Sequence, residues 1–162
     1  MLDPFLLWLE ATAFSIWIRE SPSILAFPMI LAVHTIGMGL LAGINAALDL
    51  RILGFAPRIP VVEFRRFLPV MWLGLCLNVS SGILLLIAYP TKALTNPVFY
   101  LKLSLIAGAL LILKVVRRRA LTDGARAGPL RHLALLSLLC WAGAITAGRL
   151  LAYTYTRLWA GS

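Results

Sequence analysis

The chain has 162 residues, of which 61% are hydrophobic and 13% are charged, and its mean hydropathy is +0.93. Soluble domains carry about 25% charged residues, so this composition excludes an ordinary soluble domain and predicts a membrane protein. The formal net charge of +9 comes from Lys and Arg clusters between apolar runs. The positive-inside bias of membrane proteins explains that pattern, and nucleic-acid binding is not expected.

Residues 1–20 are predicted to form a separate amphipathic helix at the membrane surface. The opening MLDPFLLWLE lacks the basic segment of a signal peptide, so we expect it to remain in the mature protein. The apolar run 4–18 is shorter than the roughly 20 residues that cross a bilayer. It also contains Glu10, whereas Trp8 and Trp17 suit the membrane interface. A re-entrant segment is the alternative.

Four later stretches are long and apolar enough to cross a bilayer: about 24–50, 68–89, 97–116 and 130–156. Each has a proline near its start, where the missing N–H would be unpaired in any case. The predicted fold is therefore an all-α membrane protein. We expect a single domain of residues 1–162, with four transmembrane helices in a bundle and the N-terminal interfacial helix beside it.

The basic residues predict the orientation of this bundle. Arg and Lys are concentrated in the loops 51–66 and 114–131, whereas the loop between the second and third spans contains only Lys92. Basic loops face the cytoplasm in most membrane proteins. The N-terminal helix and the C-terminus are therefore predicted on the outer, periplasmic side.

The first span contains one of the two histidines, within FPMILAVHTIGMGLLAGINAAL. A helix rises 1.5 Å per residue, which places His34 roughly 9 to 15 Å below the outer end of the span. His132 lies at the cytoplasmic start of the fourth span, about 20 Å away along the membrane normal. The two histidines are thus too far apart to ligate one metal within the chain.

Lys102 and Arg149 are predicted at about the height of His34, and ionisable residues inside a membrane indicate a functional site by default. One hypothesis is a haem b site, with His34 as the metal ligand and the two cations pairing with the propionates. In the alternative, His34 forms a hydrogen bond to a neighbouring helix and the Lys102 stem extends to the surface. Arg149 would then pair with Glu10 and attach the N-terminal helix to the bundle.

The first span also carries a small-residue face, Gly37, Gly39 and Gly43, that suits close helix packing or leaves room for a flat macrocycle. At its cytoplasmic end, Asp49 and Arg51 are expected to form an interfacial charge pair. The spans contain no Ser/His/Asp set and no paired carboxylates, so an autonomous enzyme is not expected.

Four stretches carry a resemblance to a known group of proteins: MLDPFLLWLE, HTIGMGLLAGINAALDLRILG, NPVFYLKL and AGRLLAY. On these the chain resembles an uncharacterised bacterial family of four-span membrane proteins, a domain of unknown function. It is more distantly similar to cytochrome b-type and copper-resistance D-type bundles. The resemblance implies the bacterial inner membrane and haem- or copper-linked redox work. Members of the family often have a histidine near the cytoplasmic end of the third span, where this chain has Lys114 and Val115, so a second axial ligand is not expected.

Three functions follow as hypotheses. The first is a haem b subunit that transfers electrons between a quinone and a partner protein. The second is a non-catalytic accessory or assembly subunit, surrounded by lipid and bound to other membrane subunits or to a second copy of itself. Copper-linked transport comes third, because Met29, Met38, His34 and Cys76 are scattered rather than stacked along one path.

Overall fold

The computed structural model describes residues 3–122 and 130–154, which form helices and no strand. Its long helices are α3 (Phe27–Leu53), α4 (Leu68–Ala88), α6 (Pro97–Val116) and α7 (Arg131–Tyr153). Four helical segments in this part of the chain are long and apolar enough to cross a membrane. The predicted all-α, four-span membrane fold is therefore confirmed.

Local signals in the sequence set where these helices begin and end. Pro28 and Pro69 occupy the first turns of α3 and α4. The side chain of Asn96 caps α6 by accepting a hydrogen bond from the backbone N–H of Val98, at 3.0 Å. At the other end of α3, Gly54 adopts φ 110°, a left-handed conformation that terminates a helix at little cost only in glycine.

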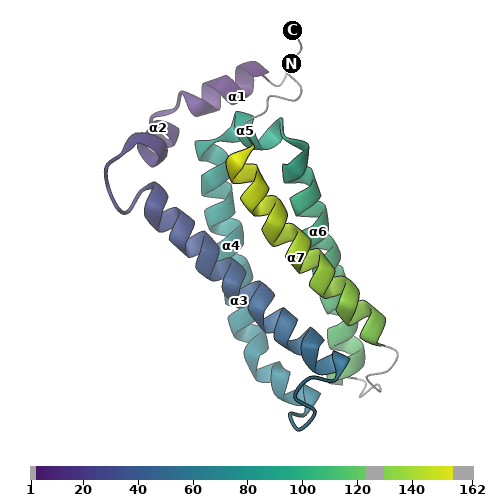
Figure 1. The fold of residues 1–162 in the computed structure, drawn as a ribbon. Coiled ribbons are helices and arrows are strands. Elements are labelled where there is room, and N and C mark those ends of the chain that lie inside the picture. Colours follow the sequence, from purple (N-terminus) through teal and green to yellow (C-terminus); the bar gives the residue numbers. More distant parts are fainter. Residues whose placement is uncertain (1–2, 123–129, 155–162) are drawn as a thin grey trace.

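The long helices form two hairpins, α3–α4 and α6–α7, which join where α3 packs against α7 (Figure 1). Helices α4 and α6 flank this contact and make little contact with each other. The short helix α5 (Pro90–Leu94) connects the hairpins, and we call its side of the bundle the α5 end. The opposite side, the basic end, contains η1 (Val61–Phe67) and η2 (Arg117–Thr122).

Helices α3 and α4 pack closely at a pair of glycines, Gly37 and Gly74. A Cβ atom built on Gly37 would lie 2.7 Å from the backbone nitrogen of Asn78 and 2.8 Å from the carbonyl oxygen of Gly74. One built on Gly74 would lie 2.9 Å from the Gly37 carbonyl oxygen. Both residues must lack a side chain for the two backbones to pack at this distance, so the packing predicted for the small-residue face holds at Gly37.

Large apolar side chains fill the interior towards the basic end. This core joins residues of all four long helices and includes Leu41, Leu48, Met71, Leu113 and Trp141. A smaller cluster at the α5 end joins Ile18, Ile30 and Ala88, so it ties the N-terminal segment to α3 and α4.

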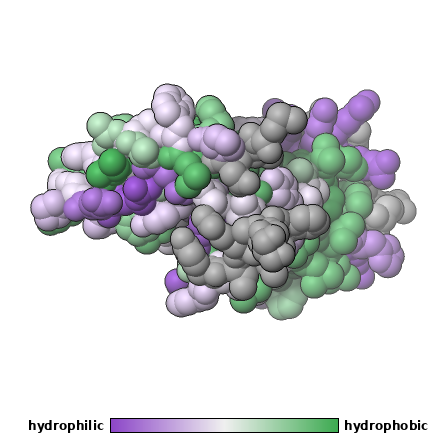
Figure 2. Space-filling view, turned by 90° about the horizontal axis from the view of Figure 1, so that it is seen from above, coloured by the Kyte–Doolittle hydropathy of each residue, from purple (hydrophilic) through white to green (hydrophobic). Residues whose placement is uncertain are grey.

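The N-terminal segment consists of two short helices, α1 (Asp3–Glu10) and α2 (Ala13–Glu20), where a single amphipathic helix was expected. The hydroxyl of Thr12 separates them: it donates to the carbonyl of Leu9 at 2.7 Å and accepts from the backbone N–H of Ser15 at 3.3 Å. Hydrophilic and hydrophobic residues lie side by side at this end of the molecule (Figure 2). Exposed Trp8 and Trp17 belong to this segment, as a membrane-interface position requires.

Candidate functional site

His34 lies half-buried on α3 and faces α4, where its Nδ1 is 3.0 Å from the Ser81 hydroxyl. The Ser81 hydroxyl also lies 2.6 Å from the carbonyl oxygen of Leu77 and 3.2 Å from that of Asn78. When its single proton goes to either carbonyl, the Ser81 oxygen accepts from an N–H at Nδ1 of His34. In that tautomer the lone pair of Nε2 is available for a donor or a metal ion.

Lys102 of α6 lies within electrostatic range of His34. Two glycines make room for the pair: a Cβ on Gly82 would lie 3.4 Å from Cε1 of His34, and one on Gly148 would lie 3.8 Å from Nζ of Lys102. The tertiary structure thus brings together two of the three residues predicted for the site.

The third predicted residue, Arg149, is exposed on α7, next to the Gly148 that Lys102 contacts. Its expected ion pair with Glu10 is wrong. The Glu10 carboxylate instead accepts a hydrogen bond from the backbone N–H of Thr91, at 3.1 Å. Thr91 lies in the first turn of α5, where an acidic side chain is favourable.

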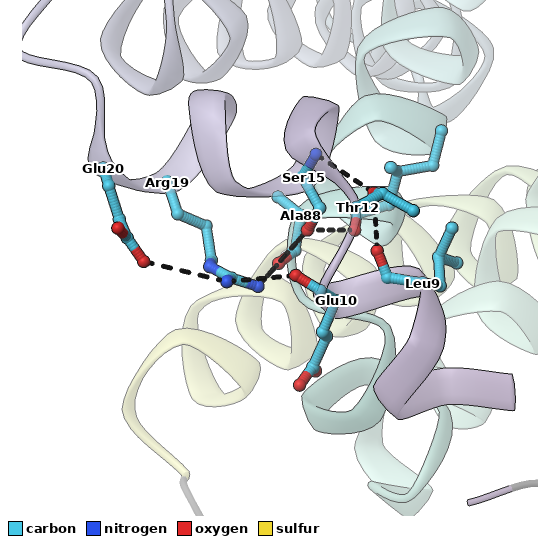
Figure 3. Close-up of polar contacts among 8 residues, drawn as sticks. Leu9, Glu10, Thr12, Ser15, Arg19, Glu20 and Ala88 are labelled. Atoms are coloured by element: carbon cyan, nitrogen blue, oxygen red, sulfur yellow. Dashed lines mark hydrogen bonds and ion pairs between the residues drawn. The ribbon is translucent and has the colours of Figure 1, made fainter. Parts of the chain in front are cut away.

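Arg19 of α2 attaches the N-terminal helices to the bundle (Figure 3). Its guanidinium donates to the carbonyl of Ala88 at 3.1 Å and to the carbonyl of Glu10 at 3.2 Å. The buried hydroxyl of Ser15 donates to the carbonyl of Ile87 at 3.0 Å. Ile87 and Ala88 end α4, and the last carbonyls of a helix have no partner within it. Docking of α2 therefore satisfies the C-terminal end of α4.

We expect Arg19→Ala to release α1 and α2 while the four long helices stay folded. Hydrogen bonds from a charged group contribute about 1.5–3 kcal/mol, so amide hydrogen exchange in α2 should rise at least about tenfold. Arg66→Ala is the matched control, because Arg66 lies at the basic end and, among the described residues, forms its ion pair with Glu63. Equal protection of α2 in both variants would show that apolar burial alone holds these helices.

A second polar site lies between α3 and α7, towards the basic end, and the sequence analysis missed it. It contains Asn45, Asp49, Ser137 and Trp141, each no more than 2% exposed. The Ser137 hydroxyl accepts a hydrogen bond from the Asn45 side chain at 3.1 Å, and the buried Asp49 carboxyl lies beside it. Ser137 therefore connects the Asn45 side chain of α3 to α7.

The charge pair expected between Asp49 and Arg51 is wrong. Arg51 turns away from the bundle and donates to the backbone carbonyls of Pro57 and Ile59, which follow α3. Asp49 points into the interior, and no carboxylate–cation pair involves it within the described residues.

Among the described residues, this second polar site also contains buried polar atoms that lack a hydrogen-bond partner: Oδ1 of Asn45, Oδ2 of Asp49 and Nε1 of Trp141. The first two are acceptors and the third is a donor. A sequence signal was present, since Asn45 and Asp49 are four residues apart, as are Ser137 and Trp141. That spacing puts each pair on one face of its helix.

No family model, curated protein or solved structure matches this chain. The resemblance to the four-span bacterial family therefore has no matched relative behind it. Fold and sites define a helical multi-pass membrane protein with two interior polar sites. Within residues 3–122 and 130–154, no three His, Cys, Asp or Glu side chains gather in a way that would hold a metal ion.

Proposed function

We propose that this protein is a non-catalytic subunit of a larger assembly in the bacterial inner membrane, formed with other membrane subunits or with a second copy of the chain. The observation that carries the proposal is an exposed small-residue stripe on α3. A Cβ atom on Gly39 or on Gly43 would meet nothing within 4 Å, and Ala47 continues the stripe one turn further, also exposed.

Such a stripe has a cost that lipid contact alone does not offset. Glycine inside a helix is less favourable than alanine by about 1 kcal/mol, and lipid makes no use of the space that its missing side chain leaves. Membrane helices associate through close backbone packing, for which glycines four residues apart are typical. The Gly37–Gly74 contact shows that this chain uses glycine in that way internally. Gly39 and Gly43 offer an equivalent surface to another helix.

The proposal includes an orientation. The basic end carries Arg58 before η1, Arg65 and Arg66 within it, and Arg117, Arg118 and Arg119 in η2. Basic segments favour the cytoplasmic side, which puts the α5 end and the exposed aromatic residues of α1 and α2 at the periplasmic surface. The stripe on α3 then faces the bilayer laterally.

The double variant Gly39→Leu/Gly43→Leu is expected to release the chain from its assembly. Native electrophoresis of mild-detergent extracts should show the assembled fraction falling at least about tenfold, which corresponds to a loss of about 1.4 kcal/mol of association free energy. Ala142→Leu adds the same kind of bulk at an exposed position of α7 and should leave the assembly unchanged. A wild-type chain that migrates as an isolated monomer would refute the proposal. Equal assembled fractions of the double glycine variant and Ala142→Leu would also refute it.

Haem b binding at His34 is the second candidate, and the hydrogen bond to Ser81 favours it. A histidine that ligates a metal usually donates its other ring N–H to a fixed acceptor, and Ser81 is such an acceptor for Nδ1. A bound haem would supply one-electron chemistry between a quinone and a partner protein. The chain would hold the iron through Nε2 of His34 and would offer Lys102 as a cation for a propionate, with Arg149 next to the Gly148 that lies beside Lys102.

A reduced-minus-oxidised spectrum of the purified protein tests this candidate. We expect a haem signal that His34→Ala abolishes and that Ser81→Ala shifts, because the imidazole would lose its orienting acceptor. Thr35→Ala, which removes another hydroxyl bonded to its own helix, should leave the spectrum unchanged. If the purified protein shows no haem absorption, His34 does not bind haem and is a structural hydrogen-bonding residue. Copper-linked transport remains a third hypothesis, and no described contact favours it.

A further inference from the structure

A groove of about 550 Å³ opens on the flank of the bundle between α4 and α6, where these helices make little contact with each other. Trp72 of α4 lines one side of it. The other side is the face of α6 from Ala107 to Lys114, together with Arg117 at the start of η2. The groove belongs to neither interior polar site, since none of their residues lines it.

The lining of the groove changes in character along α6. Ala107, Leu110 and Leu111 form an apolar wall, and Lys114 and Arg117 follow at its basic end. Lys114 lies roughly 10 Å beyond Ala107 along the helix axis. The groove thus starts within the apolar part of the bundle and ends at the polar boundary of the membrane-spanning region.

The two cations line the same groove. Lys114 and Arg117 are three residues apart on the sequence, a spacing that makes helical side chains neighbours. Lys114 is exposed and Arg117 is half-buried. No carboxylate in the described part of the chain pairs with either of them.

We propose that this groove binds an anionic phospholipid of the adjoining leaflet. One acyl chain lies along Ala107, Leu110 and Leu111, and the phosphate is held between Lys114 and Arg117. Basic pockets between membrane helices favour anionic headgroups for this reason. A zwitterionic lipid adds a cationic group beside these two cations, and an apolar partner helix would leave both of them uncompensated. A free anion would leave the apolar wall uncovered.

Lipid retention tests the proposal. The full chain is reconstituted in vesicles of equal parts phosphatidylglycerol and phosphatidylcholine and extracted, and the lipids that remain bound are quantified by mass spectrometry. We expect phosphatidylglycerol to be retained in preference to phosphatidylcholine. Arg117→Gln and Lys114→Gln should each lower its retention about fivefold, the ratio equivalent to about 1 kcal/mol per basic residue. Arg118→Gln, an exposed neighbour that does not line the groove, should retain it as the wild type does.

A second pair of variants tests the apolar wall with the charges unchanged. Ala107→Phe fills the groove and should reduce phosphatidylglycerol retention, whereas Ala142→Phe on the exposed face of α7 should not. A monodisperse elution profile and an unchanged melting temperature show that each variant is folded. Equal retention of the two lipids by the wild type would overturn the proposal. Equal losses of phosphatidylglycerol retention in Arg117→Gln and Arg118→Gln would also overturn it, and so would no loss in Ala107→Phe. In either case retention would depend on surface charge and not on the groove.

Discussion

Gly37→Ala is expected to destabilise the protein, whereas Gly39→Ala, two residues away on the same helix, should stabilise it slightly. A methyl group on Gly37 would meet backbone atoms of α4, the nitrogen of Asn78 at 2.7 Å and the carbonyl oxygen of Gly74 at 2.8 Å. Backbone cannot move aside as a flexible side chain can, so α3 and α4 must separate. Overpacking of this kind costs about 1–3 kcal/mol.

The comparison isolates packing from helix propensity. Both substitutions replace glycine by alanine inside α3, which favours the helix by about 1 kcal/mol in each case. The added Cβ atom meets neighbouring atoms only at Gly37, because a Cβ on Gly39 has nothing within 4 Å. Reversible unfolding of the monomer in detergent micelles measures both changes. If Gly37→Ala raises the free energy of unfolding as Gly39→Ala does, the close α3–α4 contact is absent in solution.

Ser137→Ala should cost about 1–3 kcal/mol, because its hydroxyl is the hydrogen-bond partner of the buried Asn45 side chain. Its loss leaves the Asn45 amide unpaired, next to the buried Asp49 carboxyl. A buried polar group left unpaired costs about 1–3 kcal/mol, and the site already contains unpartnered atoms. No other described hydrogen bond takes up the Asn45 side chain.

Ser104→Ala is the matched control for this second prediction. Ser104 is an exposed residue of α6, and its hydroxyl donates to the carbonyl of Tyr100 within the same helix, at 2.9 Å. Its removal leaves no buried group unpaired, so the free energy of unfolding should change by less than about 0.5 kcal/mol. Thermal unfolding of both variants in the same detergent measures their change in stability relative to the wild type. Similar stability of the two would mean that Ser137 does not connect α3 to α7.

Several features were predictable from the sequence because they depend on neighbours along the chain. The length and apolar composition of four stretches predicted four membrane-spanning helices, and Pro28 and Pro69 marked where two of them begin. Trp8 and Trp17 marked the surface segment. The break between α1 and α2 was missed, because the Thr12 hydroxyl that makes it gives no periodic signal.

The candidate sites were predictable only in part. Sequence position gives the height of a residue in a bundle, and on that basis His34 and Lys102 were expected near each other, as the structure has them. Height does not give the direction in which a side chain points. Arg149 was expected inside and is exposed, while Asp49 was expected at the surface and is buried.

The sequence by itself determined the class of protein, the number of its spans and the approximate ends of its helices, because composition and local capping decide these. Only the tertiary structure decided which face of each span is interior. A helix that is apolar on all sides carries no amphipathic signal to orient it, and α3 is such a helix. Its packing against α4 and α7 therefore determined that Gly37 is enclosed while Gly39 is open, that His34 meets Ser81, and that Asp49 meets Ser137.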